Sequence, residues 1–95
     1  MALLAALASE AVTVGTTTAV GLTIANLIGA TEVEITVEGG PIRYLTTGGT
    51  PIAGGPGTLL YDGGSKPLSI LQANRLRMIG DGNAATVRAV FLGPR

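Results

Sequence analysis

Two neighbouring stretches decide the fold: T-E-V-E-I-T-V at residues 31–37 and I-R-Y-L-T at residues 42–46. In the first stretch, Val33, Ile35 and Val37 alternate with Glu and Thr, which is typical of a strand with one buried and one wet face. A pair of glycines lies between the stretches, and glycine readily takes the positive φ angles of type I′ and II′ turns. We therefore expect the two stretches to form a β-hairpin.

The glycine pair also sets the register that we expect for this hairpin. Val37 would face Ile42, and Ile35 would face Tyr44, on the buried side of the sheet. On the wet side, Arg43 would lie between two glutamates of the first strand and form weak, exposed ion pairs with them.

Short alternating runs separated by Gly, Pro, Asn and Asp continue through the rest of the chain, as in an all-β protein. In the run at residues 84–92, Ala85, Val87, Ala89 and Phe91 share one face, while the other face becomes apolar toward its end. Such a strand is either central in a sandwich or covered by another chain. Further strands are expected at residues 58–61, 66–71 and 74–79, and at 11–14 and 19–24 (or as one kinked strand there), with an exposed, irregular loop at 48–57.

The predicted fold is therefore a small antiparallel β-sandwich or jelly-roll-like barrel of about seven or eight strands. Residues 11–95 would form the sandwich domain, and residues 1–10 a short apolar arm or helix. The apolar start is far shorter than the roughly 20 residues that cross a bilayer. It also lacks the basic residue that precedes the apolar part of a signal peptide.

The composition favours association with other subunits. Hydrophobic residues make up 46% of the 95-residue chain and charged residues 13%, about half the usual charged share. There is no cysteine, so no disulfide can stabilise so small a domain, and oligomerisation is the expected source of further burial. The alternative is that a surface rich in glycine and threonine simply replaces the missing charges.

The charges are divided unevenly along the chain. Residues 1–40 contain four glutamates and no basic residue, whereas residues 41–95 contain six basic residues and two aspartates, so the formal charges are −4 and +4. Cross-strand pairing inside one molecule explains this division. A head-to-tail contact between an acidic and a basic face of two copies is the alternative.

The residue types needed for catalysis are largely missing. With no histidine and no cysteine, Ser-His-Asp, Cys-His and histidine-based zinc sites are excluded. Glu32, Glu34 and Glu38 would form a solvated ridge, and the Asp-Gly turns lack the spacing of a calcium loop. Arg75, Arg77 and Arg88 could share a face, but no aromatic residue accompanies them as in a nucleic-acid site. We expect no enzymatic activity, cofactor or metal, and neither nucleic acid nor membrane as a partner.

Residues 30–92 resemble small β-sandwich proteins from the structural modules of tailed bacteriophages. The strings that carry the resemblance are I-T-V-E-G-G-P-I-R-Y (35–44), G-G-T-P-I-A-G-G-P-G-T-L-L (48–60), L-S-I-L-Q-A-N-R-L-R-M-I (68–79) and A-T-V-R-A-V-F (85–91). They match in order and spacing, and they contain structural residues without an active-site signature.

The resemblance implies a virion protein of the decoration (cement) type, made in the host cytoplasm and bound to the capsid exterior. It would bridge major capsid subunits and associate with itself, with a trimer favoured. A tail or baseplate component is the first alternative, and a host-glycan binding module that uses Tyr61 is the second. The candidate contact residues with capsid or subunit are Leu3, Leu4, Leu7, Arg75, Arg77, Arg88, Val90 and Leu92.

Overall fold

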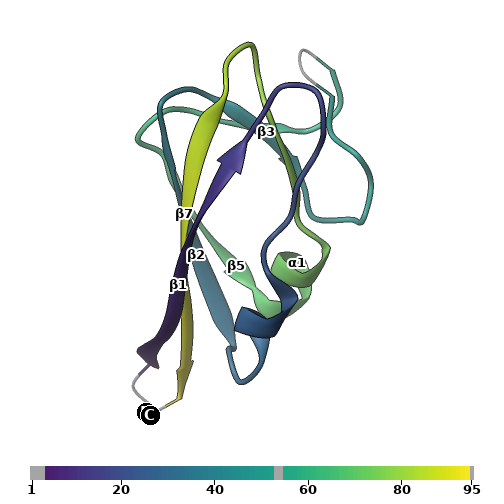
Figure 1. Ribbon diagram of the computed structural model, residues 1–95. Helices are drawn as coiled ribbons and strands as arrows, with labels where there is room; N and C mark the ends of the chain where they lie inside the picture. The colour runs from purple at the N-terminus through teal and green to yellow at the C-terminus, as the bar shows by residue number, and fades with distance from the viewer. Residues whose placement is uncertain (1–3, 53–54, 95) are drawn as a thin grey trace.

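Seven strands form two antiparallel sheets in the computed structural model, which describes residues 4–52 and 55–94 (Figure 1). The four-stranded sheet has the order β1-β7-β2-β5, and the three-stranded sheet has the order β4-β3-β6. The strands are β1 (Leu4–Val14), β2 (Glu32–Glu38), β3 (Ile42–Leu45), β4 (Thr58–Leu60), β5 (Ser65–Ser69), β6 (Arg77–Gly80) and β7 (Ala85–Pro94), with the 3₁₀ helix η1 (Ile24–Leu27) and the helix α1 (Ile70–Arg75) between them. The predicted all-β sandwich is confirmed.

Alternating aliphatic residues build the core between the two sheets. Val33, Ile35 and Val37 of β2 are fully buried, as their spacing predicts. In β7, Ala85, Val87, Ala89 and Phe91 form the predicted inner face and are also buried. Burying a Val, Ile or Phe side chain stabilises the fold by about 1.5–3 kcal/mol. β7 lies between β1 and β2, which agrees with the first of the two alternatives, a central strand.

The predicted hairpin is wrong, because β2 and β3 lie in different sheets. β2 pairs with β5 and β7, whereas β3 pairs with β4 and β6. Gly39 and Gly40 have φ angles of 91° and 153°, and they carry the chain from one sheet to the other. The carbonyl oxygen and amide of Val37 are bonded instead to Gly63 and Gly64. The apolar faces of β2 and β3 therefore meet across the sandwich instead of lying side by side in one sheet.

Arg43 therefore does not form the predicted ion pairs with the glutamates of β2. It points from β3 to the outside of the three-stranded sheet, where it contacts Asp81 and the loop that follows β3. The described residues of this loop, up to 52 and from 55 onward, are irregular, as predicted, but they do not form a free excursion. Pro51 is fully buried, and a Cβ placed on Gly57 would lie 3.1 Å from the Cβ of Arg43. The loop therefore covers part of this sheet's outer side.

From residue 4 onward the N-terminal segment is a strand, so the helical alternative is wrong there. β1 pairs with β7 from Leu4, opposite Pro94, to Val14, opposite Ala85, with a shift in register between Ala6 and Ala8. A run of a few Ala and Leu residues is too short for a stable isolated helix, and β7 offers it backbone partners. β1 continues without a break across the arm boundary expected after residue 10.

Two further segments differ from the sequence-based expectation. Residues 19–24 form no strand of their own: Val20 makes a single bridge to Met78, and η1 follows. Residues 70–75 form α1, which begins at a capping box in which Ser69 and Gln72 bond to each other's backbone amides. Leu76 and Met78, which alternate with the exposed Arg75 and Arg77, are buried, and so is Ile79.

Candidate functional site

The structure separates the predicted contact residues into three places. Arg75 ends α1 and Arg77 begins β6, Leu4 and Leu7 lie in the first half of β1, and Leu3 lies outside the described residues. The third group, Arg88, Val90 and Leu92, alternates along the solvent side of β7.

The three arginines do not form one basic stripe. Arg77 belongs to β6 in the three-stranded sheet, whereas Arg88 belongs to β7 in the four-stranded sheet. The Nε atom of Arg88 lies 3.0 Å from Oε1 of Glu38, in an ion pair whose side chains are 60% and 53% exposed. Such exposed pairs contribute at most about 1 kcal/mol. Arg88 therefore shares no sheet face with Arg77, so the three arginines do not share the single face that the sequence allowed.

The solvent side of the four-stranded sheet, which we call the outer face, is an open surface built from strands. Each strand sends every second side chain to this side, and most of these side chains are small or acidic. Its members are Ser9, Ala11 and Thr13 of β1, Thr86, Arg88, Val90 and Leu92 of β7, Glu32, Glu34, Thr36 and Glu38 of β2, and Ser65, Pro67 and Ser69 of β5. All of them are exposed or half-buried.

An apolar side chain stands near the middle of the outer face. Val90 is 36% exposed although it lies in a central strand. Its cross-strand neighbours are Ser9 on β1 and Glu34 on β2. Leu92, two residues further along the same side of β7, is half-buried. The short side chains on β1 leave this apolar patch accessible to a partner.

The outer face is acidic. It contains Glu32, Glu34 and Glu38 against the single base Arg88, a formal charge of −2. Arg88 pairs with Glu38, so Glu32 and Glu34 are without an ion pair among the described residues. From the sequence alone, these glutamates are expected to form a solvated ridge with weak ion pairs to Arg43. Their alternation on the strand beside Arg88, Val90 and Leu92 was the signal that they share one surface with these residues.

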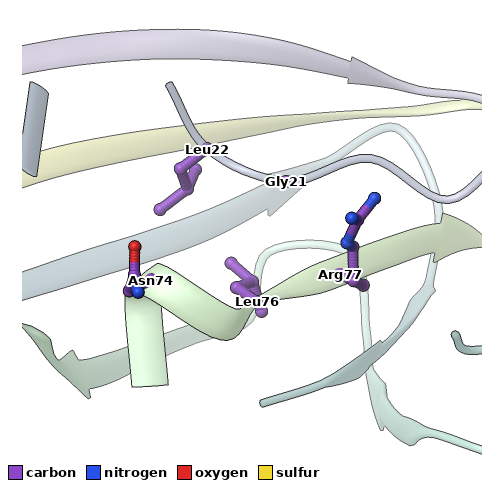
Figure 2. A pocket seen from close by; sticks show the side chains of 5 residues that line it. All are labelled: Gly21, Leu22, Asn74, Leu76 and Arg77. Carbon is purple, nitrogen blue, oxygen red and sulfur yellow. The ribbon is translucent and has the colours of Figure 1, made fainter. Parts of the chain in front are cut away.

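A shallow hollow lies between α1, β6 and the segment that precedes η1 (Figure 2). Its volume is about 220 Å³, below the roughly 300–1,000 Å³ of a typical ligand pocket. The side chains of Asn74 and Arg77 lie on either side of Leu76, with Leu22 opposite. A Cβ on Gly21 would lie 2.7 Å from the carbonyl oxygen of Leu76, which explains the glycine at this position.

Residues 4–52 and 55–94 contain no cluster of three or more His, Cys, Asp or Glu side chains that could hold a metal ion. In the same residues, no helix has the length and apolar character required to span a membrane. Comparison with known proteins gave no match to the chain, whether among protein-family models, curated proteins or solved structures.

Proposed function

We propose that this chain is a structural virion protein of a tailed phage, which decorates the capsid exterior and stabilises the shell by bridging neighbouring major capsid subunits. The observation that carries the proposal is the open outer face of the four-stranded sheet. Its counterpart on the three-stranded sheet is partly covered by the chain's own loop around Arg43. The resemblance of residues 30–92 to phage structural modules supports the same function.

The outer face is suited to docking at low entropic cost. Its residues lie on strands held in a hydrogen-bonded sheet, and many have short side chains that lose little freedom when they are covered. The charge of −2 would complement a basic patch on the capsid, and Val90 supplies an apolar contact. Such charge complementarity orients a partner and selects it against others.

The size of the outer face explains why the protein would act as an oligomer on a lattice. Strands are about 4.8 Å apart and rise about 3.3 Å per residue, so four strands of about seven residues cover on the order of 450 Å². A stable interface usually buries about 800 Å² per partner. A symmetric homo-oligomer, for which the resemblance implies a trimer, would bind through several such faces at once and gain avidity.

Host-glycan binding is the second candidate, and Tyr61 is the observation that favours it. This side chain is 66% exposed, and exposed aromatic rings are the usual platforms for sugars. The two candidates differ in a direct test on a glycan array. Binding to an array that is lost in Tyr61→Ala would favour the glycan function over capsid decoration.

The capsid proposal is tested by co-sedimentation of the purified chain with expanded, empty capsids of the tailed phage that encodes it. We expect saturable binding. The double variant Glu32→Gln/Glu34→Gln should weaken this binding at least tenfold. The matched control is Thr47→Lys/Thr50→Lys, which raises the net charge by the same amount on the loop of the other sheet and should bind like the unmodified chain.

Two results would overturn the capsid proposal. One is the absence of saturable binding by the unmodified chain. The other is an equal loss in both double variants, which would show that net charge alone attracts the chain to the capsid and that the outer face has no special part in binding.

A further inference from the structure

The four edges of the two sheets are protected to very different degrees. A strand at an edge exposes unpaired backbone N–H and C=O groups that can pair with another chain. Natural proteins protect such edges with short strands, lysine, proline or a covering segment. The edge strands here are β1 and β5 in one sheet and β4 and β6 in the other.

Three of these edges carry a recognisable protection. β5 contains Lys66 and Pro67 within its five residues. β4 is only three residues long. β6 is covered by Val20, whose amide and carbonyl oxygen bond to the carbonyl oxygen and amide of Met78 at 2.9 and 2.7 Å.

β1 lacks all of these protections. It is 11 residues long and contains no lysine, arginine or proline. It lies alongside β7 in Figure 1, and within residues 4–52 and 55–94 β7 is the only strand with which it pairs. Its one irregularity is the register shift between Ala6 and Ala8. The residues from 8 to 14 therefore form a regular strand whose second side pairs with no strand of the described residues, while the next residue, Gly15, accepts a hydrogen bond from the Gly80 amide of β6.

The single charge of β1 does not protect this edge. Glu10 is opposite Ala89, which belongs to the buried face of β7, so Glu10 points to the inner side of the sheet. Its Oε1 accepts a hydrogen bond of 2.9 Å from the Thr23 amide, and its Oε2 accepts one of 2.8 Å from the Thr23 hydroxyl. The carboxylate is thus held by its own chain and does not stand at the edge as a repulsive group.

We propose that β1 pairs antiparallel with β1 of a second copy, about a two-fold axis at Ala11. Ala11 is the centre of the regular residues 8–14, so this register forms the largest number of pairs. Opposite residues would be Ala11 with Ala11, Glu10 with Val12, Ser9 with Thr13, and Ala8 with Val14.

The register is compatible with the charge and the size of the β1 side chains. Glu10 meets Val12, so no like charges lie directly opposite each other, and the two Glu10 residues are only diagonal neighbours on the inner side. The residues on the outer side, Ser9, Ala11 and Thr13, are small, so two sheets could join without collision on that side. A two-fold contact of this kind requires only one free edge, because both copies use the same one. This favours a second copy over an unrelated strand, which would need its own unprotected edge.

This inference deepens the proposed function, since it names the surface through which copies would associate. Joining two four-stranded sheets would double the outer face to on the order of 900 Å², close to the roughly 800 Å² that a stable interface uses per partner. The two-fold pairing of β1 produces assemblies with an even number of chains, either a dimer or two trimers linked through this contact. A lone trimer would leave this edge unpaired.

Cysteine scanning of the full chain tests the register, because the chain has no native cysteine. Across the axis the Cα atoms of Ala11 would be about 4.5–5.5 Å apart, within the range for a disulfide. The Cα atoms of Ser9 are offset by four residues, or about 13 Å. Oxidised Ala11→Cys should form covalent dimers at least ten times faster than Ser9→Cys or Thr13→Cys. A mixture of the last two variants should form cross-linked heterodimers.

Light scattering over a dilution series measures the association itself, and Arg88 offers a matched pair of variants. Ala11 and Thr36 are its neighbours on the two sides, so Ala11→Glu and Thr36→Glu both place a carboxylate beside Arg88. Only Ala11→Glu brings two carboxylates together at the proposed axis. It should weaken association at least tenfold, whereas Thr36→Glu should leave it unchanged.

The pairing is overturned if the unmodified chain is monomeric at every concentration or forms only trimers. It is also overturned if cross-linking is fastest at residue 9 or 13. Capsid co-sedimentation is measured separately, so the two proposals can fail independently. If the chain binds capsids but does not pair through β1, the pairing is contradicted and the capsid proposal is not. If the chain pairs through β1 but does not bind capsids, the capsid proposal is contradicted and the pairing is not.

Discussion

Arg43 and Asp81 form a partly buried ion pair, with 3.2 Å between Nε and Oδ1 and side chains that are 23% and 20% exposed. The same guanidinium donates through Nη1 to the carbonyl oxygens of Gly55 and Gly57, at 3.2 and 3.3 Å. One side chain on β3 thus joins the turn after β6 to the loop that precedes β4. This arrangement explains how a loop rich in glycine and proline is held against the sheet.

We predict that Arg43→Met lowers the free energy of unfolding by about 1–3 kcal/mol, because two carbonyl oxygens lose their donor and a partly buried carboxylate loses its ion pair. Methionine keeps most of the apolar length of arginine, so the loss reports mainly on the polar contacts. Urea denaturation measures the change. The control is Arg88→Met, which breaks the exposed pair with Glu38 and should cost less than about 1 kcal/mol. An equal loss of unfolding free energy in the two variants would contradict the inference that Arg43 holds the loop against the sheet.

A second prediction concerns the close approach of Gly93 to β1. A Cβ at this position would lie 2.5 Å from Cδ1 of Leu7 and 2.6 Å from the carbonyl oxygen of Gly29. Gly93→Ala should therefore destabilise the fold by about 1–3 kcal/mol through overpacking, measured by thermal unfolding. Adding Leu7→Ala should recover only part of the loss, because the backbone oxygen remains. Gly15→Ala has no atom within 4 Å of its Cβ and should be close to neutral.

The capping box of α1 gives a third prediction. The Ser69 side chain accepts a hydrogen bond of 3.2 Å from the Gln72 amide, and the Ser69 amide donates one of 3.0 Å to Oε1 of Gln72. Ser69→Ala should cost about 0.5–2 kcal/mol, the usual effect of losing an N-cap. Urea denaturation checks this value. Ser65→Ala, at the other end of β5, is the matched control, and an equal effect there would argue against a capping contribution.

Alternation predicted which residues are buried, but it could not predict which strands pair. The apolar positions of β2 and β3 have the same spacing whether the strands lie side by side or face each other across the core. The glycines between them permit both arrangements. Competition from β5 and β7 for the two edges of β2 decides the outcome. The paired residues are 29 to 60 positions apart in the chain, so no local pattern indicates the pairing.

Local alternation also could not predict the helix α1, or all the residues of the outer face. N-R-L-R-M-I alternates like a strand, while S-I-L-Q just before it has the S-x-x-Q pattern of a capping box. The box is the sequence signal for α1, and the strand expected at residues 66–71 overlaps it. For the surface, alternation placed Arg88, Val90 and Leu92 together correctly. It could not show that β2 lies beside β7 and adds its glutamates to the same face.

The contact between Glu10 and Thr23 supports a last prediction. Their two hydrogen bonds tie β1 to the segment whose Val20 bridges Met78 on β6. Thr23→Val removes the hydroxyl donor and keeps the amide donor, so this segment should open more often while the core remains intact. We expect the Val20 amide to exchange its hydrogen about tenfold faster, measured by NMR, because one lost hydrogen bond costs roughly 1 kcal/mol or slightly more. Thr16→Val, in the exposed turn after β1, should leave the Val20 exchange unchanged. The same acceleration in both variants would mean that Glu10 does not hold this segment, and β1 would then carry a free carboxylate near its open edge.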